Sequence, residues 1–152
     1  MGEAYSLQLE KVIPGPIEEV FDAWLDPDSL NKWMIGVSGG IAVTRTDPVV
    51  GGKFSILMKA NETEILHEGE YRLIQRPEKL AFTRNSPYSD NTLVTIDFES
   101  LSPQSTRVRL THERFPDRTI METHRGGWES ILSAFEKHMN ARTADREAVP
   151  GD

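Results

Sequence analysis

Apolar and polar positions recur along this chain with two different periods, and the longer period marks the C-terminal part. Between residues 118 and 140, large apolar side chains fall three or four positions apart, as at Trp128, Ile131 and Phe135. This spacing is that of one buried face of an α-helix, and Asp117 is placed to cap its first turn. A helix of this length measures about 34 Å, close to the width of a sheet of about seven strands. We therefore expect one long helix to cover much of a sheet.

Two glycines interrupt this helical pattern. Gly126 and Gly127 lie in its interior, where each glycine costs about 1 kcal/mol relative to alanine. Such a penalty is tolerated where a strand, a loop or a ligand approaches the backbone closely. We expect the space above Gly127 to be filled, so that Gly127→Leu would destabilise the fold by about 1–3 kcal/mol through overpacking. His124 lies one turn before Trp128, on the side expected to face inward.

The N-terminal part of the chain predicts one strand and two short helices. Residues 5–13 alternate between apolar and polar side chains, which is typical of a half-buried strand. The prolines of segment 14–16 end that strand, and helical spacing follows over residues 17–24. Asp26 is placed to cap a second short helix over residues 27–34, whose first position is a proline.

From Ile41 onward the period changes to two, the period of a β-strand. Six strands are expected, near residues 41–46, 53–59, 64–74, 79–84, 92–101 and 106–113. A loop over residues 36–40 precedes them, and short turn-forming segments join them, as in an antiparallel meander. The fold class is therefore α+β. We expect a single domain over residues 1–140 and a disordered tail over residues 141–152.

Alternation within the strands also predicts which side chains face the long helix. The inward positions include Phe54, Met58, His67, Tyr71, Leu73, Phe82, Arg84, Ile96 and His112. Most charged residues of the strands have the opposite parity and are expected to face water.

Composition narrows the possible functions. The chain has 152 residues, a net charge of −7 and a pI of about 5.1, which disfavours nucleic acid as a partner. No apolar run is long enough to span a membrane, and the first residues do not have the pattern of a signal peptide. We therefore expect a cytoplasmic protein without a membrane partner. The absence of cysteine excludes disulfides, thiol nucleophiles and thiolate metal sites.

The sequence carries no motif that specifies a reaction. The glycines of VGGKF lack the spacing of a phosphate-binding loop, and no serine lies in a nucleophile-elbow context. His67, His112 and His124 belong to separate elements, so they would meet only if the fold brought them together. We assign no catalytic residue, metal site or cofactor from the sequence.

Several local runs, taken together and in order, resemble a known family. The runs are PGPIEEVFDAWLDPDSLNKWM, VVGGKF, EGEYRLIQRPEKLAFTR and TLVTIDF, followed by the most specific one, His124-x-x-Gly127-Trp128. They extend over about residues 7–139 and are similar to the START-like superfamily, also called helix-grip or SRPBCC. Within it, they most resemble the family named for the C-terminal domain of the activator of the 90-kDa heat-shock protein ATPase.

This resemblance implies a fold and a cavity, but no particular reaction. The helix-grip fold, shared with Bet v-like proteins, is a curved antiparallel sheet that wraps a long C-terminal helix, with a cavity between them. The superfamily includes ligand carriers, polyketide cyclases and chaperone regulators. The side chains expected to line the cavity are Trp33, Phe54, Met58, His67, Tyr71, Phe82, Arg84, Ile96, His112, His124, Trp128 and Ile131.

The leading hypothesis is that the chain binds a small apolar or amphipathic molecule in this cavity, as a monomer or weak homodimer. Apolar walls with a few polar groups are typical of such pockets, although the same residues also describe an ordinary core with polar groups at its rim. Two alternatives stay open. One is a chaperone-regulating partner, and the other is a cyclase- or hydrolase-type enzyme that uses His112 or His124 as general acid–base.

Overall fold

Seven strands form one antiparallel sheet in the order β1-β7-β6-β5-β4-β3-β2. They belong to a computed structural model that describes residues 5–34, 40–60, 62–87 and 89–148. The strands are β1 (Tyr5–Pro14), β2 (Ile41–Thr46), β3 (Lys53–Ala60), β4 (Thr63–Gln75), β5 (Lys79–Ser86), β6 (Ser89–Ser102) and β7 (Ser105–Phe115). From β2 to β7, each strand pairs with the next one along the chain, which confirms the predicted meander. The first strand joins the sheet beside β7.

Three helices complete the predicted order of elements. They are α1 (Ile17–Asp22), α2 (Pro27–Trp33) and α3 (Arg118–Ala148). The Asp117 carboxylate accepts hydrogen bonds from the first-turn amides of Thr119 and Ile120, at 2.6 and 3.2 Å, so it caps α3 as expected.

The long helix extends beyond its predicted end. Residues 141–148, expected to be disordered, are helical as far as Ala148. Five of these eight residues are alanine or arginine, which have high helix propensity, and an established helix needs no new nucleus to continue through them. Residues 149–152 lie outside the described residues, as does all of the expected loop 36–40 except Gly40.

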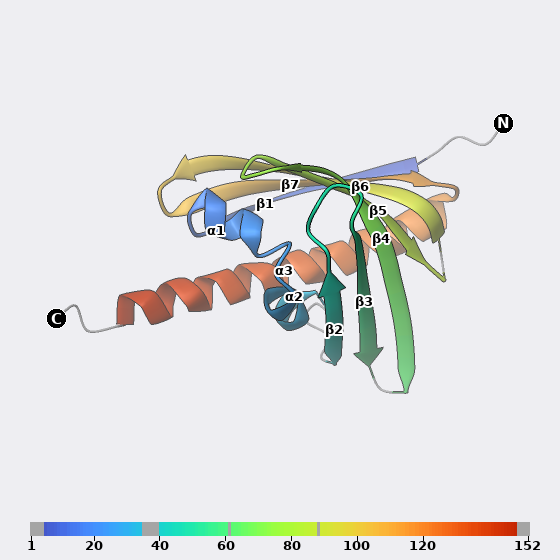
Figure 1. Cartoon of the computed structure of the whole chain (residues 1–152), viewed down its shortest axis with the longest axis horizontal. Helices are drawn as coiled ribbons and strands as arrows, with labels where there is room; N and C mark the ends of the chain where they lie inside the picture. The colour runs from blue at the N-terminus through green and yellow to red at the C-terminus, as the bar shows by residue number, and fades with distance from the viewer. Residues whose placement is uncertain (1–4, 35–39, 61, 88, 149–152) are drawn as a thin grey trace.

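The sheet is strongly bent. In Figure 1, β2, β3 and β4 turn steeply away from the direction of β1, β6 and β7, so that the sheet curves around α3. Within β4, a Cβ atom on Gly69 would collide with the carbonyl oxygen of Thr83 and with the Phe54 ring. The Thr83 hydroxyl accepts a hydrogen bond from the Glu70 amide at 3.0 Å. Gly69 therefore allows β4 to lie close to its neighbours β3 and β5.

A shift of strand register corrects one predicted inward position. Between Tyr71 and Leu73 the pairing of β4 with β5 slips, and a slip of one residue exchanges the two faces of a strand. Tyr71 is buried as predicted, but Ile74 rather than Leu73 packs against the core.

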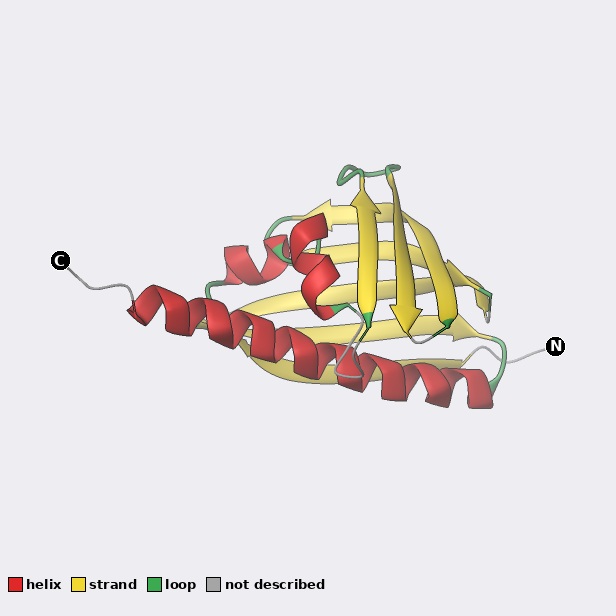
Figure 2. Cartoon of the chain, turned by 90° about the horizontal axis from the view of Figure 1, so that it is seen from below, coloured by secondary structure: helices red, strands yellow, loops and turns green. Residues whose placement is uncertain are grey.

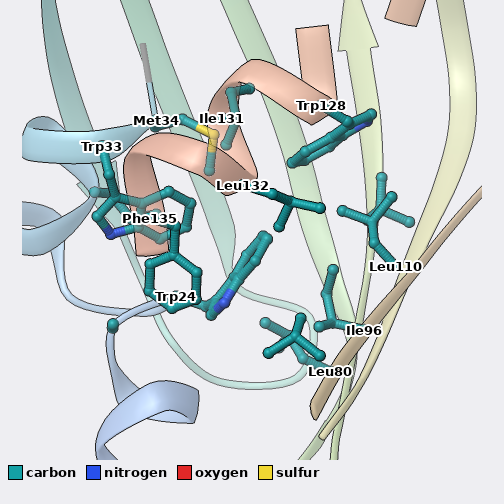
Figure 3. Close-up of a cluster of buried hydrophobic side chains, with 14 of the residues drawn as sticks. Trp24, Trp33, Met34, Leu80, Ile96, Leu110, Trp128, Ile131, Leu132 and Phe135 are labelled. Carbon is teal, nitrogen blue, oxygen red and sulfur yellow. The ribbon is translucent and has the colours of Figure 1, made fainter. Parts of the chain in front are cut away.

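The helix α3 crosses the sheet obliquely, as Figure 2 shows. Its backbone lies close to β1 and, over a shorter stretch, to β7 and α2, but it stays farther from β3, β4 and β5. The core fills the region of close approach. There the rings of Trp24, Trp33 and Phe135 meet, with centroids 4.4–5.6 Å apart (Figure 3). Because the helix is held at β1 and α2, space is left between it and the bent part of the sheet.

Substitution by alanine should have opposite effects at Gly69 in β4 and at Gly126 in α3. Gly69→Ala should lower the free energy of unfolding by about 1–3 kcal/mol, because its new methyl group has no room. Gly126→Ala should raise it by up to about 1 kcal/mol, because a methyl group there meets nothing within 4 Å and alanine favours the helix. Urea unfolding of both variants measures the two effects. Equal stability of Gly69→Ala and the wild type would contradict the close packing around Gly69.

Candidate ligand-binding cavity

A cavity of about 480 Å³ lies between α3 and the bent part of the sheet. Its volume is within the range that small-molecule sites occupy. Most of its wall is apolar, with a few polar groups. The lining side chains and backbone positions are Met34, Met58, Ile65, His67, Arg84, Thr119, Ile120, Thr123, His124, Gly127, Trp128, Ser130 and Ile131.

Two adjacent stripes of α3 have different roles. One stripe, which includes Trp128, Leu132, Phe135 and Met139, is buried in the core. The other lies one position before it, with the spacing of a helical face. It consists of Ile120, Thr123, His124, Gly127 and Ile131, all in the cavity wall. The helix therefore packs into the core with one stripe and bounds the cavity with the next, and Trp128 contributes to both.

Trp128 holds α3 to the sheet through a chain of hydrogen bonds. Its indole N–H donates to Nδ1 of His112 at 2.9 Å. An indole nitrogen only donates, so Nδ1 of His112 is the acceptor and Nε2 carries the proton. That Nε2–H reaches the Thr92 hydroxyl at 2.8 Å, and the hydroxyl donates to the Arg84 carbonyl at 2.7 Å. The chain of bonds links α3 to β7, β6 and β5 in turn.

His112 is therefore a core residue with both ring nitrogens engaged. It is 0 % exposed, and burial, reinforced by the nearby charge of Arg84, lowers its pKa to about 2. A histidine held neutral by two hydrogen bonds cannot exchange protons with a substrate without breaking them. The general acid–base role considered for His112 does not fit this geometry.

Arg84 contributes the charged group of the cavity wall. Its side chain is 7 % exposed, and its guanidinium carbon lies 4.7 Å from the centroid of the Trp128 ring, a cation–π contact. Its Nε and Nη2 lie 3.3 and 3.2 Å from Nδ1 of His67. Burial lowers the pKa of Arg84 to about 10, so the group is still charged at neutral pH.

Hydrogen bonds define the tautomers of the two histidines in the cavity wall, His67 and His124. Because an arginine only donates, Nδ1 of His67 accepts and its Nε2 carries the proton. Burial, and next the charge of Arg84, lower the pKa of His67 to about 3. The Nδ1 of His124 lies 2.8 Å from the Ile120 carbonyl, which can only accept, so Nδ1 of His124 carries the proton. Burial also lowers the pKa of His124.

A second, much smaller space lies deeper, beside Arg84 and Trp128. It has a volume of about 20 Å³, which is room for about one water molecule. Its wall includes Phe54, Tyr71 and Phe82, whose rings pack against one another with centroids 5.2–6.4 Å apart.

The side chains that the sequence predicts around one cavity lie in three different environments in the structure. Six of them line the large cavity: Met58, His67, Arg84, His124, Trp128 and Ile131. Phe54, Tyr71 and Phe82 line the small space instead. Trp33, Ile96 and His112 line neither space, because all three are completely buried within the core.

Sequence reasoning missed several residues of the cavity wall, although part of the signal was present. Ile65 has the same strand parity as His67, and Ile120 and Thr123 have helical spacing with His124. Met34, at the end of α2, carries no such signal, because its place in the wall depends on how α2 packs against β2.

The expectation for Gly127 is wrong. A Cβ atom on Gly126 or Gly127 would meet nothing within 4 Å, and Gly127 lines the cavity. No neighbouring strand or loop therefore requires a glycine there. The missing side chain instead enlarges the space beside α3, which pattern alone could not distinguish from close packing.

Among the described residues, no three histidine, aspartate or glutamate side chains are grouped so that they could hold a metal ion. None of the helices in that part of the chain is long and apolar enough to cross a membrane.

The bent antiparallel sheet, the long C-terminal helix and the two short helices define a helix-grip fold of the START-like class. A family model described as "Activator of Hsp90 ATPase homolog 1-like protein" matches residues 14–140. The chain belongs to this family, and the resemblance inferred from its sequence runs is thus confirmed. No curated protein matches the chain in sequence.

Solved structures with the same fold cover nearly the whole chain. An AHSA1-like protein from Aeromonas hydrophila is 27 % identical, with a TM-score of 0.79 over 91 % of this chain and 94 % of that one. An HSP90 activator from Plasmodium falciparum is also 27 % identical, with a TM-score of 0.65 over 89 % and 94 %. A protein from Chromobacterium violaceum, 24 % identical with a TM-score of 0.77 over 88 % and 96 %, shares the fold.

The buried state of His112 predicts a pH-dependent stability. In the unfolded chain a histidine has a pKa near 6.5, whereas the folded His112 has a pKa of about 2. Its contribution to stability is therefore fully present above about pH 6.5 and is lost as the pH falls toward 2. The non-titrating variant His112→Gln should lose less stability between pH 6.5 and 4.5 than the wild type, by up to about 1.4 kcal/mol per pH unit.

Urea unfolding at several pH values measures this difference, and the other titrating groups, which both proteins share, cancel in the comparison. Parallel pH profiles for His112→Gln and the wild type would contradict a neutral, buried His112.

Proposed function

We propose that this protein binds a small apolar or amphipathic molecule in the cavity between α3 and the bent part of the sheet. The observation that carries the proposal is the cavity itself, with a volume of about 480 Å³ and a mostly apolar wall. An apolar ligand that covers this wall removes apolar surface from water. This favours binding by about 25 cal/mol per Å² of apolar surface buried.

The positions of the polar groups support the same proposal. Arg84, His67 and His124 contribute to the wall from three different elements, β5, β4 and α3. A few fixed polar groups in an apolar site orient a ligand and select among ligands. The rigid attachment of Trp128 through His112 keeps the helix side of the cavity in place.

A second candidate function is regulation of a chaperone. The observation in its favour is the likeness to the Plasmodium falciparum HSP90 activator at 27 % identity. This role predicts saturable binding to a 90-kDa heat-shock protein and a faster ATPase rate of that protein. Calorimetry and an ATPase assay with the purified partners test it, and neither result depends on the cavity. The cytoplasmic location and the monomeric or weakly dimeric state stay predictions.

An enzyme that uses a cavity histidine has weaker support. His112 is engaged at both nitrogens, which leaves His124 as the histidine considered for that role. Its Nδ1 is held by the Ile120 carbonyl, and no carboxylate partner for it is present among the hydrogen bonds of the described residues.

The glycine pair of α3 offers a direct test of the cavity proposal. Gly127→Leu should place a bulky side chain in the cavity, whereas Gly126→Leu adds the same side chain where no cavity wall is formed. Both changes should leave the fold at least as stable as the wild type, because leucine favours the helix by up to about 1 kcal/mol. Only Gly127→Leu should weaken ligand binding, by about tenfold or more, or 1.4 kcal/mol.

Calorimetry with a panel of fatty alcohols and flavonoids measures this difference on variants shown to be folded. If no member of the panel gives saturable heat with the wild type, or if the two leucine variants bind equally well, the cavity is not the binding site.

A further inference from the structure

Among the residues that the structure describes, the buried guanidinium of Arg84 has no negatively charged partner. Its side chain is 7 % exposed, and none of the ion pairs formed by the described residues includes it. A charge removed from water is costly unless a counter-charge or several hydrogen bonds compensate it. An apolar side chain at the position of Arg84 would not carry this cost.

The neighbours of Arg84 hold it in place without neutralising it. The Trp128 ring, 4.7 Å away, offers only its electron-rich face. His67, whose Nδ1 accepts from Arg84, is neutral. A guanidinium has five N–H groups. The Nε and Nη2 of Arg84 lie within reach of His67, and no hydrogen bond between described residues involves its Nη1, while the residue itself lines the cavity. The proton on Nε2 of His67 is a further donor in the same wall.

The geometry points to Arg84 as the anchor for the carboxylate of an amphipathic monocarboxylic acid, whose apolar part fills the rest of the cavity. This inference rests on the proposed function and assigns its ligand class. A carboxylate presents two acceptor oxygens that match the planar fork of a guanidinium. The remaining wall, which includes Met58, Ile65 and Ile131, suits a hydrocarbon chain or ring.

The charge of the wall favours one negative charge rather than two. Arg84 is the one lysine or arginine among the described residues of the cavity wall. The two histidines of that wall, His67 and His124, are shifted toward their neutral forms. A single carboxylate would balance the single guanidinium, whereas a phosphate dianion would bring an unbalanced charge into a site of low polarity.

Octanoate and octan-1-ol, which share a chain length and differ in charge, test this inference by calorimetry at pH 7.5. The wild type should bind octanoate about 10- to 100-fold more tightly, the range expected for hydrogen bonds to a charged group. In Arg84→Met, which keeps a side chain of similar length without the charge, the ratio of the two dissociation constants should fall to about one. Gly126→Leu should keep the wild-type ratio.

A stability measurement separates an anchoring role from a structural one. Without ligand, Arg84→Met should unfold at the same urea concentration as the wild type or at a higher one, because it removes an unpaired buried charge. Octanoate should raise the unfolding midpoint of the wild type and not that of Arg84→Met. In the wild type, the Nε–H resonance of Arg84 should shift when octanoate is added and not when octan-1-ol is added, a readout that needs no variant.

Different results would separate the anchoring role of Arg84 from ligand binding in the cavity. Equal affinity of the wild type for octanoate and octan-1-ol, or a preference that survives in Arg84→Met, would overturn the anchoring role and leave ligand binding in the cavity intact. A less stable Arg84→Met that retains the preference would assign Arg84 to the core instead. Saturable binding of neither compound to the wild type would overturn both the inference and the proposed function.

Discussion

The hydrogen bond from the Trp128 indole to His112 is the constraint on which the rest of the cavity depends. It fixes α3 to β7 inside the core and, through Thr92, to β6 and β5. Loss of the acceptor would leave a buried N–H without a partner, at a cost of about 1–3 kcal/mol. Because α3 is fixed there and packs along β1, it cannot settle onto β3 and β4. The cavity exists because the helix is held elsewhere.

The same tryptophan connects this framework to the charge in the wall. One face of the Trp128 ring lies beneath the guanidinium of Arg84, and the ring also contributes to the cavity wall. A fold selected for stability alone would not keep an unpaired guanidinium at that depth. The structure therefore combines a satisfied chain of polar groups, which links α3 to the sheet, with a buried guanidinium that no ion pair among the described residues neutralises.

Much of the fold could be predicted from the sequence, because it depends on local periodicity. The pattern of apolar and polar positions predicted the change of period at Ile41 and the return of helical spacing after Asp117. The same pattern predicted that His67, Arg84 and His112 face inward. The cavity could not be located in this way. Pattern shows that a side chain faces inward, but whether it meets the core, as His112 does, or a cavity, as His67 does, depends on where α3 crosses the sheet. Gly127 was misinterpreted for the same reason.

Methyl NMR of isoleucine residues can show whether a ligand enters the space between α3 and the bent part of the sheet. Ile65, Ile120 and Ile131 line the cavity, whereas Ile13 and Ile96 are buried in the core and Ile41 is exposed on the edge strand β2. When octanoate is added, the account predicts saturable shifts that are largest for the three cavity methyl groups. Shifts confined to Ile41, or no saturable shift at any of the six, would contradict it.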